Sequence, residues 1–336
     1  MSTMREVAAA AGVSVKTVSR VFNGDPHVLR PTRERVQAIL REMNYVPSDL
    51  PAALRAGRAS VIGVAIPDII DPFFAAITQA VQISANERGM QTLVTSLGGD
   101  VSAEPSMVEG LLKRGLSGLI MTPIGPDQSY LRAWSGKVPL VFVDRQPSQL
   151  AADSISDDDE GGAVLATRHL LEHGHRRIAF LGDHPVFLTT IKRVEGYCAE
   201  LGRSGIEPDE DLIVPGVNDR AEAREAVTRL LALPDPPTAI FSSNARCTMV
   251  LLPAIENLGL AVVGFGDFPM ADVVTPSVTV IDQDPHKIGR LAAERVFDRL
   301  DHPARRFRRR TVLPVGLRRR RSCCATPQNP AGEPCT

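Results

Sequence analysis

Apolar residues recur at helical spacing in three short segments at the start of the chain. The first segment, TMREVAAAAG, ends at Gly12, a residue type that commonly terminates helices. The second begins at Ser14, which can cap a helix, and runs to about Phe22, before NGDP interrupts the pattern. The third, PTRERVQAILREMN, has its apolar residues along one stripe: Val36, Ile39, Leu40 and Met43. We therefore expect three short helices around one small core.

The pattern changes twice after the third segment. The stretch VPSDLPAALRAGRAS lacks a long apolar face and contains two prolines and a glycine, which is typical of a linker with room for one short helix. From Val61, buried-strand patterns alternate with helical segments, and the strand patterns are VIGVAI, QTLVTS, GLIMT, PLVFVD, RIAFLG, TAIFSS and AVVGFG. Strands that alternate with helices predict parallel sheets with helices on both faces.

The alternation of strands and helices continues for longer than one sheet of ordinary size requires. An acidic, serine-rich stretch, DSISDDDEGG, falls near its middle. We therefore expect two lobes with a cleft near their junction, because ligands of such sheets bind outside the carboxyl ends of the strands.

The composition agrees with a protein of several folded units. The chain has 336 residues, of which 43% are hydrophobic, so it can bury a sizeable core. Its net charge is only −1, but residues 1–58 contain nine basic and five acidic residues, and residues 305–321 contain nine arginines and no acid. Basic ends on an acidic body suit a polyanionic partner.

Neither a membrane segment nor a disulfide framework is indicated. No apolar run approaches the ~20 residues that span a bilayer, and the N-terminus lacks a signal-peptide pattern, so we expect a cytoplasmic protein without membrane contact. The five cysteines form no spaced pairs of the kind that bind zinc, and their odd number argues against a disulfide framework.

The stretch HLLEH resembles a metal-binding motif. HLLEH matches the H-x-x-E-H pattern of some zinc peptidases. It lies, however, at the end of a helix that stops at Gly174, where His173 and His175 more simply complement the helix C-terminus. We therefore expect neither a metal nor a cofactor.

The second short helix has the features of a DNA-reading helix. In AGVSVKTVSRVFNG it follows a tight turn, carries polar and basic residues outward, and lies in the basic head ahead of the linker. An amphipathic surface helix is the alternative. If the helix enters the major groove, the residues expected at base edges are Val15, Lys16 and Arg20. The residues expected at phosphates are Ser14, Thr17, Ser19 and Asn23.

Several motifs together resemble the lactose repressor (LacI/GalR) family of bacterial transcription regulators. They are REVAAAAGVSVKTVSRVFNG, TRERVQAILREMNYVPS, DPFFAAI, LVFVDR, HLLEHGHRRIAFLG, RVEGY and VTPSVTVIDQDP, in the family's order. The resemblance implies a dimeric regulator, most simply a repressor, that binds double-stranded operator DNA. It also implies a two-lobed body similar to periplasmic sugar-binding proteins, which senses a small sugar-like effector. The family's hinge helix inserts a leucine into the minor groove, and Leu54 matches that position.

These expectations divide the chain into four regions. Residues 1–47 form an all-α helix-turn-helix domain, residues 48–60 a hinge helix or linker, and residues 61–317 an α/β two-lobed ligand-binding domain. Residues 318–336 no longer resemble the family and are expected to be a disordered tail. The alternative is a cytoplasmic solute-binding or sugar-processing protein that uses the same cleft. The basic head, and the lack of a signal peptide, nucleophile elbow or phosphate loop, favour the regulator.

The resemblance and the strand ends together suggest the effector-binding residues. DPFF places Phe73 and Phe74 just after the first strand of the body, where core packing is the alternative for each. RVEGY aligns Arg193 with the family's effector-binding arginine, whose guanidinium can hold two oxygens. Polar residues that end three other strands complete the set: Asp144, Arg145, Asn244, Arg246 and Asp267.

The charge of the expected cleft suggests a class of effector. Three arginines, Arg145, Arg193 and Arg246, are expected there, while Ala245 and Gly266 stand where the family often has carboxylates. We therefore favour an anionic sugar derivative, such as a sugar acid, over a neutral sugar. The alternative is that Arg145 and Arg246 point into solvent or pair with the acids of SDDDE, which leaves Arg193 to bind hydroxyls.

Overall fold

The computed structural model of the chain describes residues 4–22, 25–43 and 61–323. The chain forms two compact units, Met1–Ala59 and Ser60–Thr336. Asn23, Leu54 and the expected hinge lie outside the described residues. None of the helices in the described ranges combines the length and the apolar character that a membrane span needs.

The first unit contains the three helices that the apolar spacing predicts. They are α1 (Met4–Ala11), α2 (Val15–Phe22) and α3 (Arg30–Glu42). Gly12 makes the turn between α1 and α2 with a φ of 62°, a conformation that residues with a Cβ rarely adopt. The buried core of the unit consists of Val7, Ala8, Ala11, Val18, Val21 and Val36. Each helix contributes to this core, so the three stabilise one another.

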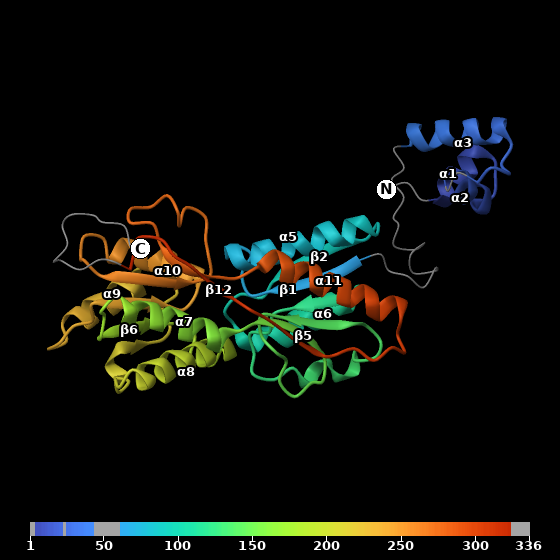
Figure 1. Cartoon of the computed structure of the whole chain (residues 1–336). Coiled ribbons are helices and arrows are strands. Elements are labelled where there is room, and N and C mark those ends of the chain that lie inside the picture. Colours follow the sequence, from blue (N-terminus) through green and yellow to red (C-terminus); the bar gives the residue numbers. More distant parts are fainter. Residues whose placement is uncertain (1–3, 23–24, 44–60, 324–336) are drawn as a thin grey trace. The chain divides into compact units, whose positions relative to one another are not determined.

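The second unit contains two lobes, each built on a six-stranded sheet (Figure 1). In the first lobe the strands are all parallel, in the order β11-β5-β4-β3-β1-β2. Their bounds are β1 (Val61–Ile66), β2 (Gln91–Ser96), β3 (Gly118–Met121), β4 (Leu140–Val143), β5 (Asp153–Asp157) and β11 (Arg310–Leu313). The main helices are α5 (Pro72–Glu87), α6 (Glu104–Leu112) and α11 (Pro285–Asp301).

The strand β1 is apolar at nearly every position because both of its faces are covered. Ile62, Val64 and Ile66 pack against α5 and α11, whereas Ala65 packs with α6 on the other face. Helices α5 and α11 lie side by side (Figure 1), and Gly289 of α11 sits at their contact, where an added Cβ would collide with the carbonyl oxygen of Ile77. The position of α5, which begins in the cleft, is therefore fixed by close packing.

The second lobe repeats this plan with one antiparallel strand at an edge. Its strand order is β12-β10-β9-β8-β6-β7, and only the β10–β12 pair is antiparallel. The strands are β6 (Ile178–Leu181), β7 (Ile213–Val214), β8 (Ala239–Ser242), β9 (Ala261–Phe265), β10 (Thr279–Asp282) and β12 (Gly316–Arg318). Two helices cover one face, α7 (Asp159–Glu172) and α8 (Leu188–Arg203), and two cover the other, α9 (Arg220–Leu231) and α10 (Ala245–Leu251).

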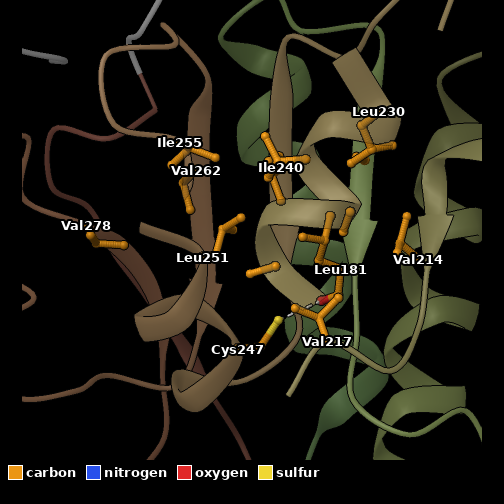
Figure 2. Packing of buried hydrophobic residues seen from close by; sticks show 14 of the residues in the cluster. Leu181, Val214, Val217, Leu230, Ile240, Cys247, Leu251, Ile255, Val262 and Val278 are labelled. Atoms are coloured by element: carbon orange, nitrogen blue, oxygen red, sulfur yellow. Dashed lines mark hydrogen bonds between the residues drawn. The ribbon is translucent and has the colours of Figure 1, made fainter. Parts of the chain in front are cut away.

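The core between this sheet and helices α9 and α10 is shown in Figure 2. Ile240 of β8 packs in one cluster with Leu230 of α9 and Leu251 of α10. The Sγ atom of Cys247 lies 3.6 Å from the carbonyl oxygen of Leu181 and donates a weak hydrogen bond to it (Figure 2). This packing fixes the first turn of α10, which faces the cleft.

In both lobes the strand order reverses next to the first strand. Strand β1 lies between β2 and β3, and β6 lies between β7 and β8. Such a reversal opens a crevice at the carboxyl ends of the strands, where ligands bind. The chain passes between the lobes three times, after β5, after β10 and after β11 (Figure 1).

The expectation of a disordered tail is wrong for residues 318–323, which fold onto the second lobe. Arg320 donates hydrogen bonds to both carboxylate oxygens of Asp267, at 2.6 and 2.9 Å. The hydroxyl of Ser322 donates to the carbonyl of Val262 at 2.5 Å, and Cys323 is buried. These tertiary partners order residues that composition alone assigns to solvent. Residues 324–336 lie outside the described part of the chain.

Candidate functional site

Helix α2 presents two different faces. Val18 and Val21 are buried in the core of the first unit, whereas Val15, Lys16 and Arg20 are exposed. Thr17 and Ser19 are half-buried between these faces, and Ser14 is exposed at the start of the helix. The three residues expected at base edges therefore lie at the surface, as DNA contact requires.

Two of the residues expected at phosphates bond to each other. The Oγ atom of Ser14 accepts a hydrogen bond from the backbone N–H of Thr17 at 3.1 Å, and the two hydroxyl oxygens lie 2.9 Å apart. Ser14 therefore caps α2, as the sequence predicts.

Arg20 forms an ion pair with Asp25, an acid just beyond the end of α2. Its Nε atom lies 2.7 Å from Oδ2 of Asp25, and the backbone N–H of His27 donates to Oδ1 of the same carboxylate at 2.9 Å. The hydrogen bonds from Arg20 and from the His27 backbone hold the pKa of Asp25 well below its ordinary range. Arg33 donates to the Asp25 carbonyl at 2.7 Å, so Asp25 connects α2 to α3. The guanidinium of Arg20 is thereby held in one orientation.

In the second unit, side chains from both lobes enclose a cavity of about 30 Å³, which has room for one or two water molecules. The first lobe contributes Asp71, Phe73, Phe74, Asp144 and Arg145. The second lobe contributes Asp183, Thr189, Thr190, Arg193, Asn244, Ala245 and Gln283. Six of the eight residues expected at an effector site therefore come together in one place.

The beginning of α5 supplies an acid and two aromatic rings. Asp71 follows β1 and caps α5, since its Oδ1 accepts from the N–H of Phe73 at 2.9 Å. Burial raises the pKa of Asp71 to about 6. The rings of Phe73 and Phe74 meet edge to face at 5.3 Å, and Phe74 belongs to the core of the first lobe. Phe73 is half-buried and is thus the more accessible ring to a ligand.

Asp144 and Arg145 occupy a tight turn after β4. Asp144 has a φ of 66°, and the N–H of Arg145 donates to the carbonyl of Val143 at 2.7 Å. The Arg145 guanidinium lies 3.8 Å from the centre of the Phe187 ring in the other lobe, and its Nε is 3.3 Å from Oδ2 of Asp144. Burial raises the pKa of Asp144 and lowers that of Arg145, so each charge depends on the other.

Arg193 has protein partners for its whole guanidinium. Its Nε and Nη2 atoms lie 2.8 and 2.7 Å from Oδ1 of Asp159, and Nη1 donates to the carbonyl of Ser243. The plane of the group stacks on Phe265 at 3.8 Å. Arg193 is therefore a buried arginine that organises the cavity wall.

Arg246 reaches the cavity only through another residue. Its Nη2 donates to Oδ2 of Asp183 at 3.1 Å and to the side-chain oxygen of Asn218 at 2.9 Å. Asn244 donates to the same oxygen of Asp183 at 3.2 Å, and its own Oδ1 caps α10 by accepting from the N–H of Cys247 at 2.7 Å. Asp183 thus receives both of these side chains.

The prediction of a surplus of positive charge in the cleft is wrong, because each of the three arginines forms an ion pair with an acid. Five carboxylates lie in the cavity wall or directly behind it: Asp71, Asp144, Asp157, Asp159 and Asp183. They outnumber the guanidinium groups of Arg145, Arg193 and Arg246. The alternative assigned the acids of SDDDE to Arg145 and Arg246, and this assignment is also wrong: Arg193 pairs with Asp159, whereas Arg145 and Arg246 pair with Asp144 and Asp183.

Asp157 connects the lobes. Its Oδ2 accepts a hydrogen bond from Nε2 of Gln283 at 2.6 Å, and its Oδ1 has no hydrogen-bond partner among the described residues. Burial raises the pKa of Asp157 to about 7, and burial raises that of Asp159 to about 6. Protonation of Asp157 near neutral pH is therefore coupled to the contact between the two lobes.

Asp267 lies apart from the other expected effector residues. Its carboxylate is held by Arg320, and it lines a neighbouring hollow of about 330 Å³ that shares Phe73 and Gln283 with the cavity. Asp267 therefore lies beside the cavity and not in its wall, and the folded residue Arg320 takes its charge.

Two further cleft residues, Asp183 and Asp71, carry a signal in the sequence. Asp183 ends a strand in RIAFLGD, as Asp144 does in FVD, and Asp71 precedes proline at a helix start. Thr189, Thr190 and Gln283 carry no comparable signal, because they reach the cavity only through the packing of α8 and the end of β10.

Both units match known proteins. Residues 3–48 match bacterial regulatory proteins of the lacI family, and residues 59–315 match periplasmic binding proteins and the sugar binding domain of the LacI family. The ribose operon repressor of Escherichia coli (strain K12) is 30% identical, over 95% of this chain and 99% of its own.

Two solved structures are similar along nearly the whole chain. The lac repressor dimer bound to operator and the anti-inducer ONPF is 29% identical, with a TM-score of 0.79 over 96% of this chain and 99% of its own. The complex of the transcriptional regulator CelR with cellobiose is 28% identical, with a TM-score of 0.70 over 96% and 100%. The chain therefore belongs to the LacI family of bacterial regulatory proteins and is a DNA-binding transcription regulator.

Proposed function

We propose that this regulator is a repressor that reads operator DNA with the first turn of α2 and responds to a small ligand in the cleft. The exposure of that turn carries the proposal: Val15 is 41% exposed and Lys16 is exposed, although Val18 in the same helix is buried. In the helix-turn-helix docking geometry, the first turn of such a helix meets base edges in the major groove. The ribose operon repressor and the lac repressor, both similar to this chain, support the direction of regulation.

The residues of α2 take different roles in this proposal. Lys16 has no hydrogen bond or ion pair within the described residues, so its ammonium is available to guanine, and Val15 suits a thymine methyl group. Arg20 approaches DNA with the orientation that Asp25 imposes. Ser14, Thr17 and Ser19 are proposed to stand near phosphates, with Ser14 keeping its capping role.

Selection of binding sites from random-sequence DNA with the full-length protein tests this function. We expect a near-palindromic sequence to be enriched, because a two-fold dimer presents two heads. The control is Lys16→Ala, which should still bind DNA at low salt but enrich a different or weaker sequence. Enrichment of no sequence by the wild-type protein, at a salt concentration where it binds DNA, contradicts the proposal.

We propose that the ligand is uncharged and rich in hydroxyl groups. An anionic ligand would enter a cleft in which five carboxylates already outnumber three arginines, and it would compete with Asp144, Asp159 and Asp183 for the guanidinium groups. Hydroxyl groups instead donate to carboxylates, and Phe73 offers an apolar face to a sugar ring. The cellobiose complex of CelR agrees with a neutral ligand.

Ligand binding in this proposal changes the distance between the lobes. The cavity of about 30 Å³ is an order of magnitude smaller than the ~300 Å³ of a typical small-molecule site. Side-chain contacts that close it across the lobes include Gln283 with Asp157 and Phe187 with Arg145. The lobes must therefore separate to admit a sugar, and the three chain crossings are the places where the backbone can bend.

We propose that the protein acts as a homodimer through the first lobe. Ile70 is 83% exposed beside exposed Ile69, Ile83 is exposed on α5, and Leu93 and Val94 are exposed on the edge strand β2. Exposed apolar residues on an edge strand and a nearby helix mark an interface. Sedimentation analysis should give a dimer for the wild type and a monomer for Ile83→Glu, with Ser84→Glu as a neighbouring control. A monomeric wild type at micromolar concentration contradicts this part.

We further propose that the cleft binds its ligand without transforming it, in the cytoplasm where bacterial DNA lies. The similarity to repressors along nearly the whole chain supports this. Nuclear magnetic resonance of a ligand found by thermal-shift screening, after prolonged incubation with the protein, should show the unchanged compound. Formation of a product that depends on Asp183 contradicts the proposal.

A further inference from the structure

A cluster of two histidines and one cysteine lies in the second lobe and belongs to neither of the sites described above. His169 lies in the last turn of α7, and His173 is the C-cap residue four positions later, so both rings lie on one side of the helix end, with their centres 4.3 Å apart. Cys323 reaches the same place from the end of the described chain. One ring nitrogen of each histidine and Sγ of Cys323 all lie within 4.8 Å of one another.

His169 has an unusual environment for a polar side chain. It is only 2% exposed, and neither of its ring nitrogens has a hydrogen-bond partner among the described residues. A buried donor or acceptor without a partner costs roughly 1–3 kcal/mol, so such groups call for a ligand, a water molecule or an ion. An imidazole nitrogen without a partner among the described residues is a candidate to bind a metal.

A hydrogen bond to the backbone of α7 orients the ring of His173 for metal binding. Its Nδ1 lies 2.7 Å from the carbonyl oxygen of His169, and because a carbonyl can only accept, Nδ1 carries the proton. The lone pair is then on Nε2, as in metal sites where a carbonyl orients the ligating ring. His173 is half-buried, so an ion has a path to the cluster from solvent.

Several neighbours hold Cys323 in place. Its carbonyl oxygen accepts from Nε2 of His175 at 3.2 Å, the hydroxyl of Thr279 lies 3.7 Å from its Sγ, and the adjacent Ser322 is bonded to Val262. The spacing of the two histidines in H-x-x-E-H is explained equally well by contacts at the C-terminal end of α7. The third metal donor, Cys323, lies far from α7 in the sequence, so no local motif predicts that it joins the two histidines.

We propose that His169, His173 and Cys323 bind a transition-metal ion, with Zn(II) as the ion that fits best. Two imidazole nitrogens and a thiolate are borderline to soft ligands, which favour zinc over calcium or magnesium. Tetrahedral zinc with bonds of 2.0–2.3 Å places such donors about 3.4–3.6 Å apart, so the side chains need to close by about 1 Å. The thiol of Cys323 gives up its proton to solvent when the ion binds.

The ion would fasten the end of the described chain to α7 and leave a fourth coordination position. Glu172, the acid of the H-x-x-E-H pattern, is exposed and is not among the clustered groups, so the geometry is not that of a peptidase. Helix α7 begins at Asp159, the partner of Arg193 in the cleft. The proposed site and the cleft therefore lie at opposite ends of one helix.

Titration of the metal-free, full-length protein with Co(II) tests the proposal, because tetrahedral Co(II) absorbs in the visible region and a thiolate adds a charge-transfer band in the near ultraviolet. The protein carries no histidine tag and is kept reduced with a phosphine. We expect one equivalent of Co(II) to produce both features and Zn(II) to displace it. The same spectrum in Cys323→Ser, or no thiolate band in the wild type, overturns the proposal.

Matched variants separate the cluster from other histidines and cysteines. His169→Ala and Cys323→Ser should lose the bound Co(II), whereas Cys198→Ser and His302→Ala should keep it, because these two residues lie outside the cluster. X-ray absorption of the zinc-loaded wild type needs no variant and so does not depend on whether a substituted protein folds. It should show imidazole nitrogen and at least one sulfur bound to zinc, and a shell without sulfur overturns the proposal.

Discussion

The Nε and Nη2 atoms of Arg193 lie 2.8 and 2.7 Å from one oxygen of Asp159, and both side chains are almost entirely buried. A buried pair of this kind depends on both partners, since the loss of one leaves the other charged in a medium that solvates it poorly. The pair therefore links the stability of the second lobe to the shape of the cleft.

The first prediction concerns this pair. Arg193→Met and Asp159→Asn should each lower the free energy of unfolding by about 3 kcal/mol, and the double variant should lose less than the sum. Urea unfolding gives these values. Lys113→Met, which breaks an exposed pair with Glu109, is the control and should cost less than about 1 kcal/mol. Additive losses in the cycle would mean that the two residues do not interact energetically.

The second prediction concerns pH. Burial raises the pKa of Asp157 to about 7 from an ordinary value of 3.8, so between these pH values the folded protein holds a proton that the unfolded chain releases. The resulting stabilisation is present at low pH and is lost as the pH rises to about 7. The free energy of unfolding of the wild type, relative to Asp157→Asn, should therefore fall between pH 5 and pH 8.

The expected slope for Asp157 approaches about 1.4 kcal/mol per pH unit at most. Urea unfolding gives the free energy of unfolding of both proteins, and the contribution of histidine titration cancels in their difference. That contribution has the opposite sign where burial lowers a histidine pKa, as at His169, because stability then rises with pH. Asp272→Asn, at an exposed position, is the matched control. A wild type and an Asp157→Asn variant with parallel pH profiles would reject the assignment.

The third prediction concerns DNA. Lys16→Ala should weaken binding to the selected operator by about 1–3 kcal/mol and binding to random DNA much less. If Asp25 orients Arg20, Arg20→Ala and Asp25→Ala should weaken operator binding to a similar extent. If the Asp25→Ala variant instead binds the operator more tightly than the wild type, the acid only neutralises the charge of Arg20. Fluorescence anisotropy measures both, and affinity should fall by orders of magnitude between low and moderate salt.

The fourth prediction concerns the ligand. In calorimetry, an aldose should bind at least about tenfold more tightly than its aldonic acid, a difference of about 1.4 kcal/mol. The acid must approach five carboxylates, whereas the aldose can donate hydrogen bonds to them. Tighter binding of the acid would restore the anionic effector that the sequence favours.

The fifth prediction concerns the contact between α5 and α11. Gly289→Ala should destabilise the protein by about 1–3 kcal/mol, because a Cβ would collide with the backbone of Ile77. Gly202→Ala, in α8 with open space around it, should instead stabilise by about 0.5–1 kcal/mol. Urea unfolding distinguishes the two, and equal effects would show that the helices can move apart without cost.

Much of the fold follows from local patterns, and the exceptions have physical causes. All seven predicted strands form. Six of them are apolar because both of their faces are buried in a parallel sheet, whereas β2 (QTLVTS) is a largely exposed edge strand. The stretch DSISD, interpreted as the junction between lobes, is itself the strand β5. Its Asp153 is buried because Arg295 and Arg299 bind it from α11, and no local pattern shows partners so distant in sequence.

The candidate site is predictable in its members but not in its charge. Arg193, Asp144 and Asn244 meet at one cavity, as the strand ends and the family resemblance suggest. Their electrostatics depend on Asp159 and Asp183, which the fold brings to the arginines from other elements. A count of charges along the chain cannot give the charge of a pocket, because the partner that neutralises each arginine is set by tertiary structure.

The three crossings between the lobes also have a genetic consequence. A stop codon just after the codon for Asp282 would remove α11 and β11 from the first lobe and β12 with Cys323 from the second. The first lobe would lose a helix that covers α5 and an edge strand beside β5, and the second would lose the residues that hold Asp267. Late truncations of this gene should therefore behave as null alleles for ligand sensing, not as alleles that lack only a tail.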